Sequence, residues 1–243
     1  MAQYQSWQLS PLTIKVLSGG TDKRLHYYIK RCLDVSLTFL LLILLAPVVL
    51  VIAILIKLDS AGPIFYTQER VGAKRRFRDG KPVWEIQNFS LYKFRSMVND
   101  ADPSLHQAYI KAFAEGRAKT TDEAGTTFKL ANDPRVTRVG HVLRRTSLDE
   151  LPQLINVLKG QMSLVGPRPV PTYEVAEYRS WHHERLAARP GITGFWQVKG
   201  RCQVSFDQMI SMDIEYVRNQ SLWLDIKILL LTLPAIISGR GAG

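Results

Sequence analysis

Two adjacent carboxylic acids, Asp149 and Glu150, follow a pair of arginines, Arg144 and Arg145, within one short stretch of the chain. Arginine side chains can bind phosphate oxygens through two parallel hydrogen bonds. An ionised carboxylate beside a phosphate pocket lined with positive charge can attack phosphorus and form an acyl phosphate. A neighbouring glutamate can help to hold Mg²⁺, which takes one or two protein carboxylates together with substrate phosphates. The stretch therefore indicates phosphate chemistry, with Asp149 and Glu150 as candidate catalytic groups and Mg²⁺ ligands.

The sequence around these acids predicts a helix over residues 148–159. Ser147 and the glutamate three residues later have the spacing of a capping box, and Gly160 suits the position after the last turn. Pro152 favours the first turn of a helix, so Asp149 itself is an alternative cap. Either arrangement places Asp149 at a helix N-terminus, where unpaired N–H groups attract phosphate. Acids at helix starts often serve only as caps, and the dyad alone leaves that interpretation open.

Two further sets of basic residues are candidates for substrate binding. Arg168 lies between Pro167 and Pro169, and the two prolines stiffen the loop around one guanidinium group. Lys93 and Arg95 are two residues apart in an expected strand, so their side chains should lie on one face. Both features have a structural alternative, because the loop could be a simple turn and the pair a solvated face.

A second rigid loop, residues 189–197, contains two glycines and a proline and ends near Lys199 and Arg201. Its combination of aromatic and basic side chains suits a nucleotide base or a sugar. Arg201 is therefore added to the substrate-binding candidates, although Trp196 also suits the hydrophobic core.

A long apolar segment precedes these motifs and must position them relative to a membrane. Residues 35–56 contain no charged side chain, and as a helix they would extend about 33 Å, enough to cross the hydrocarbon core. Pro47 is central and should kink the helix. Lysines and arginines stay on the cytoplasmic side of membrane segments, yet here both flanks are basic. We therefore expect a re-entrant helix that bends at Pro47, with a simple spanning helix as the alternative.

The remaining elements suggest an α+β fold, mainly helical with a few short strands. We expect short strands at residues 65–67 and 90–94, a turn at Asp79-Gly80 and a helix over residues 102–119. Residues 222–237 are apolar with two charges and a proline, which favours an interfacial amphipathic helix over a spanning one, with burial in the core as the alternative.

These elements divide the chain into four parts: a mobile leader (1–22), a basic flank with the re-entrant helix (23–58), a cytoplasmic catalytic domain (59–221), and a C-terminal interfacial helix and tail (222–243).

The composition of the 243-residue chain narrows the class of partner. Its 32 Lys+Arg exceed its 21 Asp+Glu and leave a net charge of +11, which attracts phosphorylated metabolites, anionic lipids or nucleic acid. We find no nucleic-acid-binding motif, so nucleic acid is not an expected partner. Cys32 and Cys202 lie far apart without the spacing of a zinc site, and we expect both to be reduced thiols.

Taken together, the motifs resemble those of the polyprenyl-phosphate sugar-phosphate transferases, also called monotopic phosphoglycosyl transferases. The motifs occur in the order found in that family, over roughly residues 24–238. They are residues 93–97 (KFRSM), 132–135 (NDPR), 147–153 (SLDELPQ), 166–169 (GPRP) and 190–194 (PGITG). The chain looks like the short catalytic form of the family, and residues 75–89 are longer than the connection expected there.

The resemblance implies a function in which Asp149 attacks a nucleotide sugar, with UDP as the expected nucleotide, and holds a phosphosugar. Glu150 would assist through Mg²⁺ or proton handling, and Lys93, Arg144 and Arg168 would bind phosphates or the nucleotide. The acceptor would be undecaprenyl phosphate in the bacterial inner membrane, and the product would enter exopolysaccharide or other glycan assembly. A membrane-bound adaptor that binds anionic lipid without chemistry is the alternative, and a homo-oligomer is left open.

Overall fold

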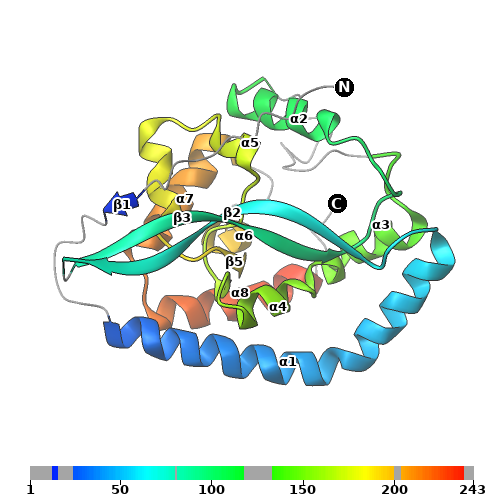
Figure 1. Cartoon of the computed structure of the whole chain (residues 1–243), viewed down its shortest axis with the longest axis horizontal. Coiled ribbons are helices and arrows are strands. Elements are labelled where there is room, and N and C mark those ends of the chain that lie inside the picture. The colour runs from blue at the N-terminus through cyan, green and yellow to red at the C-terminus, as the bar shows by residue number, and fades with distance from the viewer. Residues whose placement is uncertain (1–12, 16–23, 80, 118–132, 200–203, 238–243) are drawn as a thin grey trace.

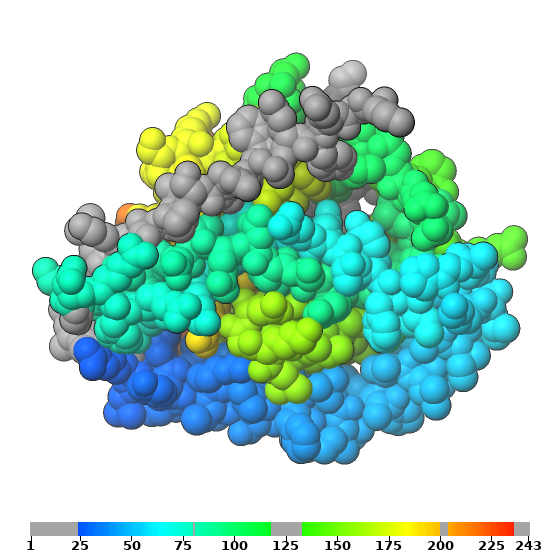
Figure 2. All heavy atoms as spheres, in the orientation of Figure 1, coloured from blue at the N-terminus to red at the C-terminus, as the bar shows by residue number. Residues whose placement is uncertain are grey.

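The helix α1 (Arg24–Asp59) forms one edge of the molecule, and the other elements lie along it (Figures 1 and 2). In this computed structural model the described residues are 13–15, 24–79, 81–117, 133–199 and 204–237. Within them α1 is the one helix that is long and apolar enough to cross a membrane. Pro47 lies inside the helix, and Figure 1 shows that α1 changes direction along its length, so that its second half rises toward α3 (Arg138–Arg145). The kink expected at Pro47 agrees with this shape.

Much of the apolar surface of α1 is not covered by protein. Phe39, Leu44 and Leu50 are each at least 60 % exposed. On the opposite side, Ile52 and Ile56 are buried, and Leu41 packs against the main core. Exposed apolar side chains of this size in a continuous helix are typical of a surface that contacts lipid.

A long β-hairpin crosses the molecule above α1. It consists of β2 (Phe65–Arg78) and β3 (Lys81–Phe94), which pair antiparallel along their full 14 residues. β1 (Thr13–Lys15) adds a third strand on the other side of β3, and these three residues belong to the expected leader, the rest of which lies outside the described residues. The turn at Asp79 is where the sequence predicts it, with a left-handed φ of 52° at Asp79. The strands are much longer than predicted. Three consecutive charged residues, 74–76, interrupt the apolar alternation that predicts a strand, yet they belong to β2, which has one solvated face.

Short helices and a second sheet complete the fold. Two strands, β4 (Ser163–Val165) and β5 (Gly191–Thr193), pair in parallel. The remaining helices are α2 (Ser104–Ala114), α3, η1 (Leu148–Glu150), α4 (Gln153–Leu158), α5 (Thr172–Val175), η2 (Ser180–Leu186), α6 (Phe195–Lys199), α7 (Phe206–Arg218) and α8 (Leu222–Ile237). The mainly helical α+β class expected from the sequence is confirmed, and the helix expected over residues 102–119 is α2.

The helix expected over residues 148–159 is divided into two elements. A 3₁₀ turn, η1, carries the two acids, and α4 begins only at Gln153. Ser147 has a left-handed φ of 57° and makes no capping hydrogen bond, so the expected capping box is wrong. Pro152 lies between η1 and α4, at the N-cap position of α4. Its ring removes a backbone donor that one continuous helix would need. Gly160, with φ of 75°, ends α4 as predicted.

The main core lies between the hairpin, α4 and α8. Its buried members include Leu91, Val157, Met162 and Ile228. Helix α8 contributes Ile228 to this core and leaves Trp223 74 % exposed and Leu230 61 % exposed on its other face. One buried and one exposed apolar face suit the interfacial helix expected for residues 222–237.

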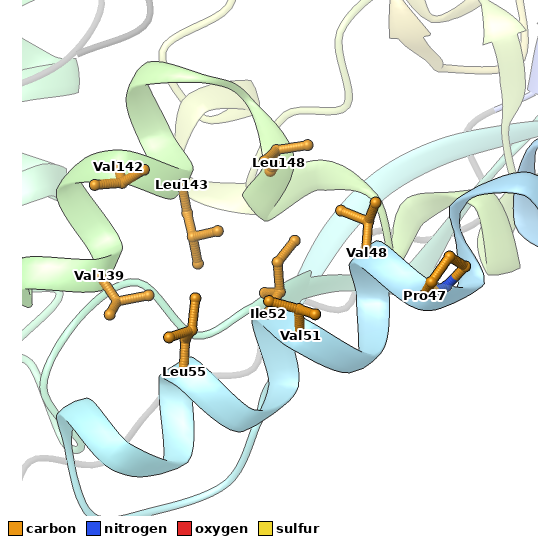
Figure 3. Close-up of a pocket in the computed structure, with 9 residues that line it drawn as sticks. All are labelled: Pro47, Val48, Val51, Ile52, Leu55, Val139, Val142, Leu143 and Leu148. Atoms are coloured by element: carbon orange, nitrogen blue, oxygen red, sulfur yellow. The ribbon is translucent and has the colours of Figure 1, made fainter.

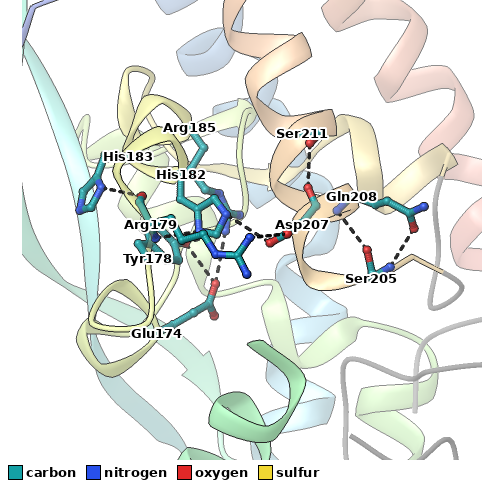
Figure 4. Close-up of polar contacts among 10 residues, drawn as sticks. All are labelled: Glu174, Tyr178, Arg179, His182, His183, Arg185, Ser205, Asp207, Gln208 and Ser211. Carbon is teal, nitrogen blue, oxygen red and sulfur yellow. Dashed lines mark hydrogen bonds and ion pairs between the residues drawn. The ribbon is translucent and has the colours of Figure 1, made fainter. Parts of the chain in front are cut away.

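A buried ionic cluster joins three of the short helices, and Figure 4 draws its members Arg185, Glu174 and Tyr178. Arg185 on η2 donates to Glu174 on α5 at 3.3 Å, to the Tyr178 hydroxyl at 2.7 Å, and to Asp213 on α7. Arg185, Glu174 and Asp213 are each at most 1 % exposed. Burial raises the pKa of Asp213 to about 6, against the lowering effect of Arg185. One cation thus holds two buried acids. Asp213 takes up a proton at a higher pH than an exposed aspartate does.

We predict that Arg185→Met lowers the free energy of unfolding by roughly 3–5 kcal/mol, because it leaves two buried acids without their cation. Asp213→Asn, which keeps a neutral hydrogen-bonding side chain in place, should cost only about 1 kcal/mol. Chemical denaturation of the detergent-solubilised protein measures both values. Equal losses in the two variants would contradict the role assigned to the Arg185 charge.

Candidate active site

The first half of α1 is attached to the rest of the chain by three charged side chains. Lys30 donates to Asp225 on α8 at 2.7 Å and to the Val165 carbonyl at 3.1 Å. Arg31 donates to two carbonyl oxygens at the end of α4. Asp34 is buried and accepts from the Ser163 hydroxyl at 2.8 Å and the Leu164 N–H at 3.1 Å. Paired, hydrogen-bonded charges of this kind set the position of a helix because breaking them leaves a buried charge alone.

The end of α1 is held by a different set, centred on Arg95. The Arg95 guanidinium donates to the Ser60 carbonyl at 2.7 Å, to the Ala61 carbonyl at 2.8 Å and to the Ile56 carbonyl at 3.3 Å. Gly62 has a φ of 124°, which strains any residue with a side chain, and a Cβ there would also lie 2.0 Å from Arg95 Nη1 and displace it. Arg95 was expected beside Lys93 as a substrate ligand. It is instead buried under the end of α1, since β3 ends at Phe94 and the alternation of side chains stops there.

The two acids lie on η1, facing the end of β3. Asp149 is buried and Glu150 is partly exposed. Lys93 Nζ lies 3.0 Å from Glu150 Oε1 and 3.7 Å from Asp149 Oδ2, so one ammonium group contacts both carboxylates. Asp149 lies in the first turn of η1, which is a single 3₁₀ turn and not the start of the expected α-helix, and Lys93 on the neighbouring strand adds positive charge beside it.

The distance between Lys93 and the acids depends on a buried amide, Asn156 on α4. Its Oδ1 accepts from the Tyr92 N–H at 3.0 Å, and its Nδ2 donates to the Ser90 carbonyl at 2.7 Å. The side chain is fully buried and pairs with β3 as a neighbouring strand would. Helix α4, and the acids immediately before it, are therefore fixed against the strand that carries Lys93.

The two glycine–proline loops pack directly against each other and present Arg168. Gly166 N–H donates to the Thr193 carbonyl at 2.9 Å, and Gly191 N–H donates to the Pro167 carbonyl at 2.8 Å. A Cβ on Gly191 would lie 2.1 Å from the Gly166 nitrogen, so the loops can approach this closely only without side chains. Arg168 Nη2 lies 3.6 Å from Glu150 Oε1.

Pro169, on the far side of Arg168, connects the loop to the hairpin. Its carbonyl accepts from Arg70 on β2 at 3.2 Å. The two prolines therefore fix a backbone that is held from both sides, and the guanidinium between them lies near Glu150. The structure thus brings Arg168 together with one of the two predicted acids.

The other predicted basic residues divide into two groups. Arg144 is partly buried, donates to the Ser96 hydroxyl at 3.1 Å and is close enough to Asp149 to interact with it electrostatically. Burial lowers the pKa of Arg144, and the Asp149 charge acts in the opposite direction. Arg145 is exposed on the other side of α3, away from the buried face of that helix. Arg201 lies outside the described residues.

Three residues near the site were not singled out by the sequence: Arg70, His106 and Tyr173. His106 Nδ1 lies 2.7 Å from the Tyr173 hydroxyl. Burial and the neighbouring arginines, Arg70 first and Arg168 second, lower the pKa of His106 to about 4, so its imidazole is neutral near pH 7. These residues come from three distant segments, and no local spacing relates them. In the sequence, only Arg70 belongs to a recognisable pattern, the alternating basic residues of β2.

The space beside the acids is small and mostly polar. A cavity of about 10 Å³, room for about one water molecule, is lined by Lys93, Glu150, Arg168 and Arg70 among others. The carboxylates are suitable oxygen ligands for Mg²⁺. No group of three or more His, Cys, Asp or Glu side chains gathers as a metal site in the described part of the chain. Two carboxylates match the number that Mg²⁺ usually takes from a protein when substrate phosphates supply further ligands.

Comparison with known proteins gives a consistent result over nearly the whole chain. A family model described as bacterial sugar transferase matches residues 25–239. The exopolysaccharide production protein ExoY of Sinorhizobium fredii is 42 % identical over 213 residues, which are 88 % of this chain and 87 % of that protein. The undecaprenyl-phosphate galactose phosphotransferase of Salmonella typhimurium is 41 % identical over 93 % of this chain and 44 % of that protein.

The UDP-glucose:undecaprenyl-phosphate glucose-1-phosphate transferase of Escherichia coli is 40 % identical over 92 % of this chain. That match covers 42 % of the Escherichia coli protein, so the chain spans less than half the length of the longer relatives.

We predict that Asn156→Ala lowers the free energy of unfolding by roughly 2–4 kcal/mol, because the Tyr92 N–H and the Ser90 carbonyl lose their partner in a buried position. Asn88→Ala is the matched control: its exposed side chain donates to Glu69 at 3.2 Å, and its loss should change stability by less than about 0.5 kcal/mol. Denaturant titration of both variants measures the difference. A stable Asn156→Ala protein would show that other contacts fix α4 against β3.

Proposed function

Because this chain belongs to the bacterial sugar transferase family, we propose that it transfers a sugar-1-phosphate from a nucleotide sugar to undecaprenyl phosphate. This transfer would begin the assembly of an exopolysaccharide or another glycan. The observation that carries the proposal is the placement of Asp149 and Glu150 against Lys93 and Arg168, next to an uncovered apolar helix. The names of the Salmonella typhimurium and Escherichia coli relatives specify the same acceptor.

We assign the attacking group to Asp149. One of its carboxylate oxygens would bond to the phosphorus next to the sugar, while the bond from that phosphorus to the nucleoside monophosphate breaks. The leaving nucleotide takes the electron pair and departs, and the sugar phosphate remains on Asp149 as an acyl phosphate. A phosphate oxygen of the lipid then attacks the same phosphorus and displaces the carboxylate. The products are a nucleoside monophosphate and a lipid diphosphate sugar.

The neighbouring cations are suited to the charge that this reaction must handle. A diphosphate carries negative oxygens that repel a carboxylate, and the positive charges of Lys93, Arg144 and Arg168 reduce this repulsion. Arg168 can present two parallel N–H groups to phosphate from a loop that its prolines hold still. Lys93 contacts both acids here, so it would exchange one carboxylate for a phosphate oxygen when the donor binds.

Glu150 and Mg²⁺ complete the proposed site. Mg²⁺ would be held by Asp149 and Glu150 together with phosphate oxygens of the donor. Bound there, the ion supplies positive charge that offsets the diphosphate. The donor is proposed to be a UDP sugar, a class that the name of the Escherichia coli relative includes.

The membrane arrangement is proposed to be monotopic, with α1 entering and leaving the bacterial inner membrane on its cytoplasmic face. Both ends of α1 make polar contacts with the same globular part of the chain. Lys30 and Asp34 make them near its start. At its end, Asp59 accepts from the Val139 N–H, and Arg95 donates to the Ile56 carbonyl. A helix that crossed a bilayer would separate its two ends by about 30 Å of hydrocarbon. These contacts and the bend of α1 support the re-entrant arrangement.

We predict that Asp149→Asn folds normally but loses nearly all turnover. The amide has almost the same shape as the carboxylate but cannot act as the nucleophile. Incubating the wild-type protein with a donor labelled in the sugar, without acceptor lipid, should leave label on the peptide that contains Asp149. The measurement is mass spectrometry of the digested protein, with nucleoside monophosphate release recorded in parallel.

Asp207→Asn on α7 serves as the control variant and should retain label and turnover, because Asp207 pairs with Arg179 and His182, at the start of η2 (Figure 4). Label that persists in Asp149→Asn would remove this residue as nucleophile and favour direct attack by the lipid phosphate.

A further inference from the structure

An apolar groove lies between the second half of α1 and helix α3, and it ends at the turn that carries the acids (Figure 3). Its volume is about 450 Å³, within the usual range for ligand sites. Every side chain that lines it is a hydrocarbon. The lining residues are Pro47, Val48, Val51, Ile52, Leu55, Val139, Val142, Leu143 and Leu148.

The groove is open where side chains of its two walls are exposed. Val51 and Leu55 on α1 are 55 % and 44 % exposed, and Val142 on α3 is 61 % exposed. In Figure 3 Ile52 and Leu55 on α1 point toward α3, and Leu143 on α3 points back across the gap. The floor is closed by Ile52 and Leu143, which are buried. An apolar channel is thus continuous with the uncovered face of the membrane helix.

The inner end of the groove lies next to the proposed nucleophile. Leu148, which lines the groove, is followed in the chain by Asp149, and both belong to η1. Helix α3 separates two kinds of side chain: its apolar face forms one wall of the groove, and Arg144 in its last turn interacts with Asp149. A ligand with a hydrocarbon chain and a negative head group would match this arrangement, with its chain in the apolar groove and its head group near Arg144.

We propose that the groove binds the isoprene units nearest the phosphate of the acceptor lipid, which rests on the function proposed above. The acceptor phosphate must reach the phosphorus held on Asp149, and its hydrocarbon chain starts at that same phosphate. The first units of the chain must therefore lie close to Leu148.

The chemistry of the lining distinguishes this occupant from an ordinary phospholipid. A polyprenyl phosphate has no polar group between its phosphate and its hydrocarbon chain. A diacyl phospholipid instead places two ester groups at the start of its chains, and burying them beside hydrocarbon side chains without hydrogen bonds is unfavourable. The groove offers side-chain hydrocarbon alone, which suits the isoprenoid.

Substitution by tryptophan tests the groove from both walls. Val51→Trp and Val142→Trp place a large apolar side chain into the groove at exposed positions, so the fold and the membrane affinity should be retained. Leu50→Trp is the matched control, because Leu50 is 62 % exposed, next to Val51, and does not line the groove. We expect the two groove variants to raise the KM for polyprenyl phosphate at least tenfold, and Leu50→Trp to change it less than twofold.

The first half of the reaction separates this proposal from the proposed function. Nucleoside monophosphate release in the absence of lipid should be unchanged in all three tryptophan variants. If wild-type protein releases none, the proposed function fails. If release is normal but the KM for the lipid is the same in groove and control variants, the groove proposal fails.

Direct labelling identifies the occupant. A photoreactive isoprenoid phosphate should label peptides containing residues 47–55 or 139–148, and excess unlabelled polyprenyl phosphate should reduce this labelling. Labelling that phosphatidylethanolamine vesicles abolish and polyprenyl phosphate does not would assign the groove to bulk lipid and overturn the proposal.

Discussion

The structure depends on the attachment of both ends of one apolar helix to the same globular part of the chain. Near its start, α1 is held by Lys30, Arg31 and Asp34. At its end, Arg95 donates to the Ile56 carbonyl and to the carbonyls of the two residues that follow the helix. These contacts join charged groups with buried partners, and losing either side of such a pair is costly. The helix cannot straighten away from the domain without breaking one set. The bend at Pro47 and the uncovered apolar middle of α1 follow from that constraint.

The same attachment places the charged residues of the candidate active site next to an apolar groove. The site side of η1 faces Lys93 and Arg168, and Leu148 on the same turn faces the second half of α1. A reaction between a water-soluble phosphate donor and a lipid phosphate needs a polar site beside an apolar surface, because the lipid substrate stays in the membrane while the donor is dissolved in water. The two glycine–proline loops and Asn156 keep the polar half rigid, so that the position of the acids relative to Lys93 is set by backbone contacts.

Several of these features could be predicted from the sequence, and the missed ones share a cause. The apolar helix with its central proline, the turn at Asp79, and the positions of Lys93 and Arg168 near Glu150 depend on local patterns, and the structure places these residues as expected. Asn156, Arg185 and Arg95 act through partners distant in sequence, and their types alone do not distinguish them from surface residues. Ser147 matches a capping pattern, which predicts a helix start at the residues that form the 3₁₀ turn, whereas the left-handed backbone of Ser147 prevents the cap.

The most direct test of the account is the location of the two ends of α1 relative to the membrane. Single cysteines at Leu25 and Leu58, which are 71 % and 79 % exposed, can be introduced after Cys32 and Cys202 are replaced by serine. An impermeant maleimide should label both positions in inside-out inner-membrane vesicles and neither position in right-side-out vesicles. Labelling of Leu25→Cys and Leu58→Cys from opposite sides would mean that α1 crosses the bilayer, and would contradict the attachment of both ends to one domain.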